Sequence, residues 1–457
     1  MSIINSVDTI CAPATATGGA LSVIRVSGPQ AFAAVSAVCT VCCDSVAANT
    51  VHYTHIKDGP ELVDEAMVSI FRAPHSYTGE DSVEISCHGS RYIMNRVLEL
   101  LIGKGCRMAR PGEFSMRAFL NGKMDLSQAE AVADLISADN RATHQMALSQ
   151  LRGHFSSELS GLRSQLLELT SLLELELDFS DHEDLEFADR SQLLQLATTI
   201  DDHVSRLAAS FKTGQALKQG IPVAIVGKTN VGKSTLLNRL LKDDRAIVSD
   251  IHGTTRDTIE DTIDIQGVSF RFIDTAGLRQ TSDQIEQIGI ERTYQAIDRA
   301  RIVLWLIDAE PTTADIADIT ARTADKALMP IWTKADTLPT PQVPYAAILS
   351  QPPLLISAMT GQGIEALETA IFAAADIPEQ TEGDVIVSNI RHYEALCHAH
   401  EGLLLVIDGL TRQIPGDLIA EDLRDVLSAL GDITGDSQII TSQDTLNHIF
   451  AHHCVGK

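Results

Sequence analysis

The segment that decides the fold reads Gly227-Lys228-Thr229-Asn230-Val231-Gly232-Lys233-Ser234. It matches the pattern G-x-x-x-x-G-K-[ST], it follows the apolar run 221–226, and residues 235–241 after it suit a helix. A strand, a glycine-rich loop and a helix in this order form a phosphate-binding loop, because backbone N–H groups and the helix N-terminus then face the phosphates. We predict that Lys233 reaches the β- and γ-phosphates and that Ser234 coordinates Mg²⁺.

Further nucleotide-binding motifs follow in the expected order. They read Gly253-Thr254-Thr255-Arg256-Asp257, Asp274-Thr275-Ala276-Gly277, Thr333-Lys334-Ala335-Asp336 and Ser357-Ala358-Met359. The Asp336 carboxylate can accept two hydrogen bonds from guanine, and adenine offers no such pair, so the motifs predict GTP. The predicted GTP-binding residues are Asn230, Val231, Gly232, Lys233, Ser234, Thr235, Thr254, Thr255, Asp274, Thr275, Ala276, Gly277, Thr333, Lys334, Asp336, Ser357 and Ala358.

Two positions depart from common GTPase patterns. Thr333 stands where the base-reading motif usually has Asn, so lost side-chain contacts are expected to weaken nucleotide affinity. Leu278 stands where many GTPases carry a Gln that orients the attacking water, and an aliphatic side chain cannot do so. A carboxylate downstream must replace it, and the candidates are Asp283, Glu286 and Glu291.

The chain around this domain predicts three parts. Residues 221–378 alternate short apolar runs with helical segments, which favours a parallel sheet covered by helices on both faces. Residues 1–118 are expected to form an N-terminal α+β domain. Residues 119–218 and 381–457 are expected to form one discontinuous helical domain, into which a P-loop GTPase domain, residues 219–380, is inserted.

Composition narrows the class of protein. The 457 residues contain 35 Lys and Arg against 61 Asp and Glu, a net charge of −26, which excludes a generic basic coat for nucleic acid. The most basic stretch, residues 88–123, has seven Lys or Arg and two Asp or Glu, and suggests either an ordinary solvated surface or a site for phosphates or a folate tail. No apolar run reaches the roughly 18 residues of a membrane span, and no signal peptide is evident. The eight cysteines are spread along the chain, and the group Cys39, Cys42 and Cys43 has no matching second pair, which favours reduced thiols. We therefore expect a cytoplasmic protein without membrane contact.

Several segments resemble signatures of the tRNA-modification GTPase family MnmE, also called TrmE. They are residues 111–126, 128–136, 175–179, 274–279 and 288–292 and the terminal Cys454-Val455-Gly456-Lys457. The resemblance implies a multidomain fold with an N-terminal α+β folate-binding, dimer-forming domain, and an all-α domain carrying an inserted P-loop GTPase α/β domain. The loop Ala16-Thr17-Gly18-Gly19 differs from the family's usual Pro-Gly-Arg-Gly and lacks its Arg.

The resemblance also implies a function. A homodimer of this family acts on tRNA with the FAD-dependent partner MnmG, as a heterotetramer, and adds an aminomethyl or carboxymethylaminomethyl group to C5 of the wobble uridine, U34. A tetrahydrofolate derivative supplies the methylene carbon. By position, Glu286 matches the catalytic switch glutamate and Cys454 the cysteine required for modification. The implied ligands are Ser234 and Thr255 for Mg²⁺, Asn230, Ser249, Ile251 and Thr254 for K⁺, and Arg25, Glu84 and Lys123 for folate or tRNA.

The GTPase motifs leave one alternative open. A ribosome-assembly GTPase of the Era or Der kind would carry the same motifs as an RNA-binding switch. The 218 residues before the GTPase domain and the terminal Cys454-Val455-Gly456-Lys457 favour the modification enzyme, since assembly GTPases are expected to carry an RNA-binding module instead.

Overall fold

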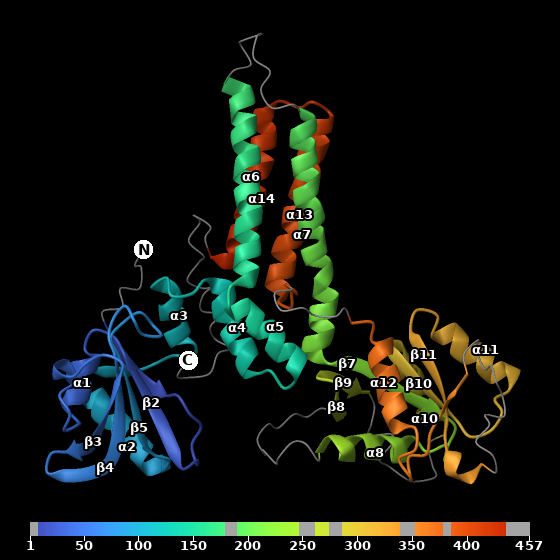
Figure 1. Ribbon diagram of the computed structural model, residues 1–457, viewed down its shortest axis with the longest axis horizontal. Coiled ribbons are helices and arrows are strands. Elements are labelled where there is room, and N and C mark those ends of the chain that lie inside the picture. Colours follow the sequence, from blue (N-terminus) through green and yellow to red (C-terminus); the bar gives the residue numbers. More distant parts are fainter. Residues whose placement is uncertain are drawn as a thin grey trace. The chain divides into compact units, whose positions relative to one another are not determined.

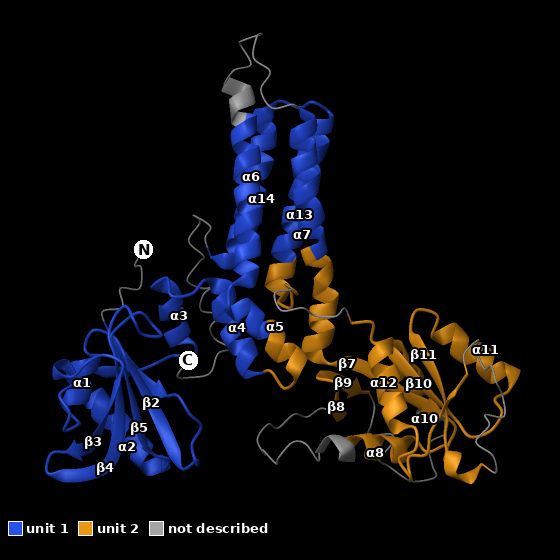
Figure 2. Cartoon of the chain, viewed as in Figure 1, with its two compact units in different colours: residues 1–137, 147–206, 394–457 blue, residues 138–146, 207–393 orange. Residues whose placement is uncertain are grey.

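The computed structural model describes residues 8–178, 190–245, 261–273, 286–338, 352–377 and 385–435, with side chains omitted at 174–178, 242–245 and 286–292. Figure 1 shows its elements along the chain. Two compact units emerge (Figure 2): residues 1–137, 147–206 and 394–457 form the first, and residues 138–146 and 207–393 form the second. Three of the four unit boundaries fall within helices, so the division differs from the domain boundaries predicted above, which stay a prediction.

A six-stranded sheet lies at the start of the first unit. Its strands, in the order β3-β4-β5-β2-β1-β6, are Thr50–Asp58, Glu61–Phe71, Ser82–His88, Leu21–Ser27, Thr9–Pro13 and Cys106–Met108. Neighbours run antiparallel, except that β6 runs parallel to β1. Helices α1 (Ala31–Ser36) and α2 (Arg91–Gly103) cover one face, where side chains from all six strands, including Cys106 of β6, form the core.

Two short helices follow this sheet. Helix α3 (Glu113–Leu120) places Phe114 against β1 residues Ile10 and Ala12. Helix α4 (Leu126–Ile136) begins with a capping box, in which the Asp125 side chain accepts from the Gln128 backbone while the Gln128 side chain accepts from Asp125 N. This start is well defined because both orphan donors of the first turn are satisfied.

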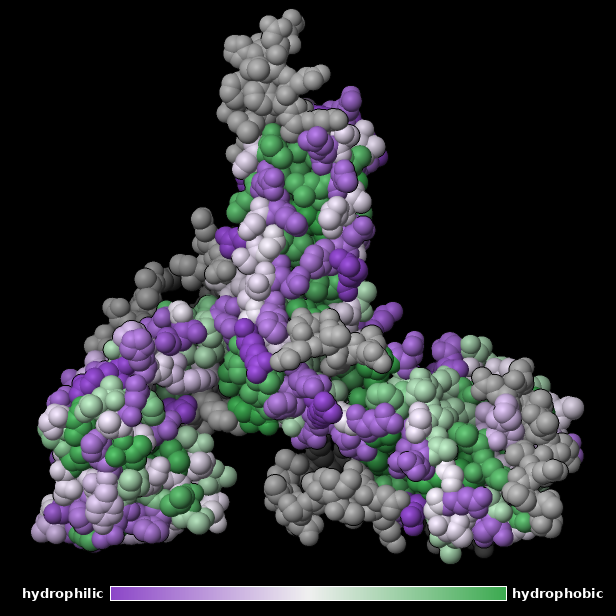
Figure 3. All heavy atoms as spheres, in the orientation of Figure 1, coloured by the Kyte–Doolittle hydropathy of each residue, from purple (hydrophilic) through white to green (hydrophobic). Residues whose placement is uncertain are grey.

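Most of the rest of the first unit comes from four long helices, shown side by side in Figure 1, of which α7 and α13 extend into the second unit. They are α6 (His154–Asp178), α7 (Arg190–Gln219), α13 (Ile390–Thr411) and α14 (Gly416–Thr434). The buried leucines of α6 recur at alternating three- and four-residue spacing, which gives the helix one apolar face: Leu159, Leu162, Leu166, Leu169 and Leu173. Figure 3 shows hydrophobic residues along the seam between the bundle helices and hydrophilic ones beside it.

Helical segments from before and after the inserted domain therefore pack together, as the fold prediction required. Polar contacts join them as well: His400 Nδ1 lies 2.6 Å from Asp201 Oδ1 across α7 and α13, and His203 Nε2 lies 2.9 Å from Glu158 Oε2 across α6 and α7. In the described part of the chain, no helix is both long enough and apolar enough to cross a membrane.

The second unit contains the predicted nucleotide-binding sheet. Its order is β12-β11-β10-β7-β9-β8, with the strands Leu354–Leu355, Ala327–Trp332, Ile302–Ile307, Ile221–Gly227, Val268–Phe272 and Asp261–Ile265. The first five strands in this order are parallel, as predicted. Strand β8, which was not expected from the sequence, adds one antiparallel edge to this sheet by pairing with β9.

Edge strand β8 exists because the chain makes a tight hairpin. Gln266 and Gly267 both have positive φ, 54° and 84°, and two such residues form the turn that matches the twist of paired strands. Ile263 and Ile265 alternate with exposed residues and point into the core. The alternation and the Gln-Gly pair were the available sequence signals for this strand.

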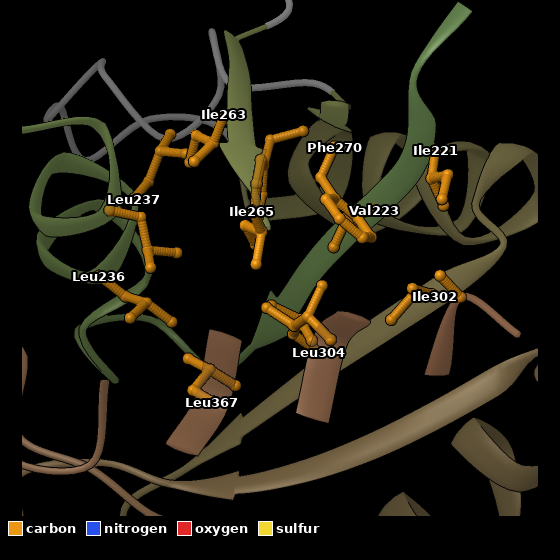
Figure 4. Close-up of a cluster of buried hydrophobic side chains, with 14 of the residues drawn as sticks. Ile221, Val223, Leu236, Leu237, Ile263, Ile265, Phe270, Ile302, Leu304 and Leu367 are labelled. Atoms are coloured by element: carbon orange, nitrogen blue, oxygen red, sulfur yellow. The ribbon is translucent and has the colours of Figure 1, made fainter. Parts of the chain in front are cut away.

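Helices cover both faces of this sheet. On one face, α8 (Lys233–Arg245) and α12 (Ile364–Ala374) enclose a cluster that includes Val223, Leu236 and Leu367, which Figure 4 shows converging between helices and strands. On the other face, α10 (Glu286–Arg299) and α11 (Thr313–Arg322) pack against alternate residues of β10, among them Trp305. The phosphate loop thus starts from a strand that is buried on both faces.

Candidate nucleotide-binding site

The phosphate loop connects β7 to α8 at the carboxyl end of the sheet. A Cβ atom at Gly227 would lie 2.5 Å from the carbonyl oxygen of Leu306, so only glycine allows β7 to leave the sheet beside β10 here. Asn230 adopts left-handed φ (61°), which Asn tolerates better than most residues. Helix α8 then starts at once, since Leu236 N donates to Gly232 O at 2.9 Å. Backbone N–H groups at this helix start are the expected anion donors.

Lys233 lies at the centre of the loop. Its Nζ donates to the carbonyl oxygens of Gly227 and Lys228, at 2.7 and 2.8 Å, so the ammonium group is held inside the curve of the loop. Burial lowers the pKa of Lys233 below its ordinary value, because the charged form loses hydration. A phosphate at this position would favour the charged form again. The arrangement suits a group that binds polyphosphate.

Thr333 joins the base-reading loop to the phosphate loop. The Thr333 hydroxyl, which is buried, donates to Val231 O at 2.8 Å, and it also lies 3.3 Å from Ile307 O. Val231 is in the phosphate loop and Thr333 follows β11, so one hydroxyl joins the two loops that are predicted to contact different ends of a nucleotide. The expectation that Thr333 simply loses contacts is therefore incomplete, since this side chain makes a contact of its own.

Asp336 is oriented before any base binds. The Ser357 hydroxyl donates to Asp336 Oδ1 at 2.6 Å, and the Ala335 backbone N donates to Ile356 O at 3.0 Å. Ser357 is fully buried and its hydroxyl also accepts from Thr360 N at 3.2 Å. These bonds hold the carboxylate at the carboxyl end of the sheet while leaving its second oxygen available for guanine N–H groups.

Two exposed ion pairs lie beside these loops, and sequence reasoning missed both acidic partners. Lys228 Nζ lies 2.9 Å from Asp315 Oδ2 at the start of α11, and Lys334 Nζ lies 2.7 Å from Asp308 Oδ2, directly after β10. Asp308 follows an apolar strand, which was a usable signal because carboxyl ends of parallel strands share one edge. Exposed pairs of this kind contribute little to stability.

The structure brings together only part of the predicted nucleotide site. Near one another lie the phosphate loop with Val231, Gly232 and Lys233, the base loop with Thr333, Lys334 and Asp336, and Ser357 with Ala358. Ser234 and Thr235 begin α8. Outside the described residues lie Ser249, Ile251, Thr254, Thr255, Asp274, Thr275, Ala276, Gly277, Asp283 and Cys454. Glu286 begins α10, and its side chain is not described.

The residues predicted to contact folate or tRNA lie in the N-terminal sheet region. Arg25 on β2 and Glu84 on β5 are directly paired in register, and their side chains form an ion pair at 2.8 Å. The Arg25 guanidinium lies over the Tyr77 ring, 5.0 Å from its centroid. Lys123 is exposed and donates to the carbonyl of Pro74 at 3.0 Å. Arginine, glutamate and an aromatic ring thus share one surface of the sheet.

The basic stretch 88–123 is largely neutralised by the fold. Arg117 is almost fully buried, at 2% exposure, and contacts Asp8, Glu80 and Glu113, while Arg107 contacts Asp8 and Glu113. These arginines hold α3 to the N-terminal strand. Because Arg107 and Arg117 are paired with carboxylates, any phosphate contact of residues 88–123 is expected from the other Lys and Arg side chains in this stretch.

Comparison with known proteins gives matches along the whole chain. A family profile described as GTP-binding protein TrmE N-terminus matches residues 9–123, and one described as MnmE helical domain matches residues 126–454. The chain is 51% identical to a tRNA modification GTPase MnmE of Bacteroides thetaiotaomicron, over 98% of this chain and 99% of the relative. It is 49% identical to one of Phocaeicola vulgatus, over 100% of both chains.

Solved structures match over shorter lengths. The G domain of the T. maritima FeoB iron transporter aligns at 19% identity over 34% of this chain and 99% of its own, with a TM-score of 0.24. The cytosolic domain of that transporter aligns at 16% identity over 47% of this chain and 98% of its own, with a TM-score of 0.26.

Proposed function

Because this chain belongs to the MnmE family of tRNA modification GTPases, we propose that it couples GTP hydrolysis to modification of the wobble uridine of certain tRNAs. The full-length similarity, at about half identical residues, carries the proposal. The site supports its GTPase half, since a phosphate loop with Lys233 and a base loop with Asp336 meet at one sheet edge. We propose that the protein acts in the cytoplasm, where its substrates are found.

Guanine selection rests on Asp336. The hydroxyl of the fully buried Ser357 donates to one carboxylate oxygen of Asp336. This bond restricts rotation of the carboxylate, so its second oxygen has a defined direction. Guanine presents two N–H donors on one edge, and adenine would leave the carboxylate without a matching donor pair. An unpaired carboxylate is costly to desolvate, which is the physical basis of discrimination.

Metal ions fit the residues of the phosphate loop. Hydroxyl and amide oxygens are ligands for hard cations, and Ser234 at the start of α8 and Asn230 in the loop supply one of each. We propose Ser234 and Thr255 for Mg²⁺ and Asn230, Ser249, Ile251 and Thr254 for K⁺. Bound there, the cations would neutralise phosphate charge, with K⁺ in the place of an arginine finger.

The remaining roles in GTP binding and hydrolysis belong to side chains and backbone groups of this chain. Lys233 and the α8 N-terminus hold the phosphate oxygens, and Thr333 keeps the phosphate and base loops in register. Leu278 cannot orient water. We therefore propose that Glu286, the first residue of α10, orients and deprotonates the attacking water.

We propose that the N-terminal sheet binds a tetrahydrofolate derivative. Glu84 can accept N–H groups of a pterin ring, Arg25 and exposed Lys123 can bind carboxylates, and Tyr77 offers a ring face for stacking. We further propose a homodimer that acts with an MnmG-like FAD protein as a heterotetramer. Together they would add the aminomethyl or carboxymethylaminomethyl group to C5 of U34.

Mass spectrometry of wobble uridine tests the function directly. The gene is deleted from its host, and tRNA is compared after complementation with the wild-type chain and with Lys233→Ala. We expect the wild-type chain to restore the modified uridine and Lys233→Ala to fail. Normal uridine modification in the deletion strain, together with a defect in ribosomal subunits, would instead support the assembly GTPase of the Era or Der kind.

A further inference from the structure

The β8–β9 hairpin is the part of the GTPase sheet that connects the two predicted switch segments. Strand β8 begins at Asp261, four residues after the motif 253–257, and β9 ends at Phe272, separated from the motif 274–277 by Ile273 alone. A change of backbone position in either motif therefore acts on one end of this hairpin. The opposite end of the hairpin is the turn at Gln266 and Gly267.

The start of helix α5 (Arg141–Leu151) is hydrogen-bonded to this hairpin. The Ala142 backbone N donates to Gly267 O at 2.9 Å, and Asn140 Nδ2 donates to Ser269 Oγ at 2.8 Å. The other atom of the same amide, Asn140 Oδ1, accepts from Thr143 N at 2.9 Å. One side chain thus caps α5 and holds the hairpin, so the helix start and the hairpin form one rigid contact.

The contact is also closely packed. Gly267 has φ of +84°, and a Cβ atom there would lie 2.8 Å from Arg141 Cβ, too close for any side chain without displacement. Ala142 is buried in the same apolar cluster as Ile263 and Ile265 of β8. A hairpin that moves must therefore take the start of α5 with it or break buried contacts.

The far end of α5 is fixed to α4. Gln128 Nε2 donates to Leu151 O at 3.0 Å, and Gln150 Nε2 donates to Ser127 O at 3.1 Å. Leu126, which precedes Ser127 in sequence, lies against the end of α14, since a Cβ atom at Gly435 would be 3.4 Å from Leu126 Cβ. Gly435 is followed in sequence by the C-terminal segment.

We propose that α5 is the coupling element that carries the nucleotide state from the β8–β9 hairpin to α4 and to the end of α14, with Asn140 and Ser269 as positioning residues. Only the biological role of this coupling rests on the proposed function, in which a change of nucleotide state would reach the segment of the chain that leads to Cys454. The contacts themselves are independent of the reaction on tRNA.

Hydrogen–deuterium exchange of the full-length protein tests the coupling. Exchange in a peptide covering residues 147–153 is compared between GDP and a non-hydrolysable GTP analogue. In the wild-type chain we expect the two rates to differ by about 5-fold or more, the lower range of allosteric coupling. Ser269→Ala and Gly267→Ala should abolish the difference and leave nucleotide affinity within about 2-fold, and Ser269→Thr, which keeps the hydroxyl, should restore it.

Gly59→Ala is the matched control for strain. Gly59 also has left-handed φ (57°), but a Cβ atom there would meet nothing within 4 Å, so the nucleotide-dependent difference should survive. Equal exchange in both nucleotide states of the wild-type chain would overturn the coupling. So would a variant that exchanges faster in both states but keeps their ratio, since that is the behaviour of a contact that only stabilises.

The uridine assay separates this inference from the proposed function. A wild-type chain that shows the exchange difference but restores no modified uridine would refute the function and retain the coupling. If the proposed function is correct, Ser269→Ala should lower the amount of modified uridine by about 10-fold while GTP hydrolysis continues. A 10-fold change corresponds to a coupling free energy of about 1.4 kcal/mol.

Discussion

Thr333 shows how a single residue can replace a usual motif residue by a different contact. Its hydroxyl ties the base loop to Val231 O, so the phosphate and guanine ends of the site are set at a fixed separation. Thr333→Val keeps the shape and removes this bond, and we expect guanine nucleotide affinity to fall about 5- to 10-fold, from a loss of roughly 1–1.4 kcal/mol.

Titration with a fluorescent GDP derivative measures this change. Thr333→Ser, which retains the hydroxyl, should bind almost as the wild-type chain does. Thr323→Val is the matched control, because Thr323 is buried in the same unit and its hydroxyl donates to Ile319 O of the adjacent helix α11. Unchanged affinity in Thr333→Val would show that the loops are positioned by other contacts.

Glu286 is the residue we propose as the general base. Glu286→Ala should leave GTP binding intact and slow hydrolysis by about 100-fold, the usual effect of losing an acid–base group. Single-turnover hydrolysis with saturating enzyme separates the chemical step from binding. Normal hydrolysis by Glu286→Ala, with failure of Asp283→Ala or Glu291→Ala, would assign the role to another carboxylate.

Asn230 motivates a prediction about monovalent cations. It occupies the exposed, left-handed position of the phosphate loop, where an amide oxygen can coordinate K⁺. We expect GTP hydrolysis to be faster in KCl than in NaCl of equal concentration, and Asn230→Ala to remove that difference. Equal rates in both salts would count against K⁺ as the source of transition-state charge.

Helix α3 gives a prediction at the level of elements. Burial raises the pKa of Glu113, but hydrogen bonds from Arg107 and from Arg110 N, with the charges of Arg107 and Arg117, outweigh it and hold the pKa below the ordinary 4.5. The ionised Glu113 carboxylate therefore stabilises the folded state fully above pH 4.5, and this stabilisation is lost as the pH falls through the lower pKa of Glu113 in the folded state.

Glu113→Gln should destabilise α3 by about 1.5–3 kcal/mol at pH 7, the contribution of hydrogen bonds to a charged group. The difference from the wild-type chain should disappear in acid, where Glu113 itself is protonated. Hydrogen exchange in residues 113–120 measures local opening at each pH. Glu99→Gln, which removes an exposed carboxylate paired only with Arg96 in the described structure, should have little effect, and a pH-independent difference at Glu113 would contradict the ionic explanation.

Elements with a strong local pattern were predictable from sequence. Strand β7 and helix α8 flank a motif whose glycines and lysine leave few alternatives, and α14 repeats apolar residues at helical spacing. Strand β8 was missed because its five residues include only two inward apolar side chains. The pairing of β6 with β1 joins residues about a hundred positions apart, and no local pattern specifies such a partner.

The site was predictable to the same extent. Lys233 and Asp336 are fixed by motif spacing, and the structure places them at one sheet edge. The Thr333 bond to Val231 and the Ser357 bond to Asp336 depend on how separate strands align, so a linear sequence cannot show them. The same holds for Asn140, whose partner Ser269 is 129 residues away.

At the scale of the whole molecule, the GTPase motifs and the proposed modification residues belong to different compact units. The phosphate loop is in the second unit, and Arg25, Glu84 and Cys454 are in the residues of the first. Helices α5, α7 and α13 cross the division between the units. Because the GTPase motifs and the proposed modification residues lie in different units, we expect single substitutions to affect GTP hydrolysis and uridine modification separately.

Cys454→Ser is the variant that separates them. Cys454 lies outside the described residues, far in sequence from every nucleotide motif, and a thiolate is a far better nucleophile than a serine hydroxyl. We expect the variant to hydrolyse GTP at the wild-type rate and to restore no modified uridine in the deletion strain. Circular dichroism of the purified variant checks that it folds.

Each result assigns a different role to the thiol. Lost modification in a folded variant with normal GTP hydrolysis places the sulfur in the reaction on tRNA. A variant that fails to fold identifies Cys454 as an anchor of the terminus, and Cys454→Ala, which keeps a small apolar side chain, should then restore modification. Full modification by the folded Cys454→Ser chain removes the thiol from the chemistry, because serine preserves size and hydrogen bonding but not thiolate nucleophilicity at neutral pH.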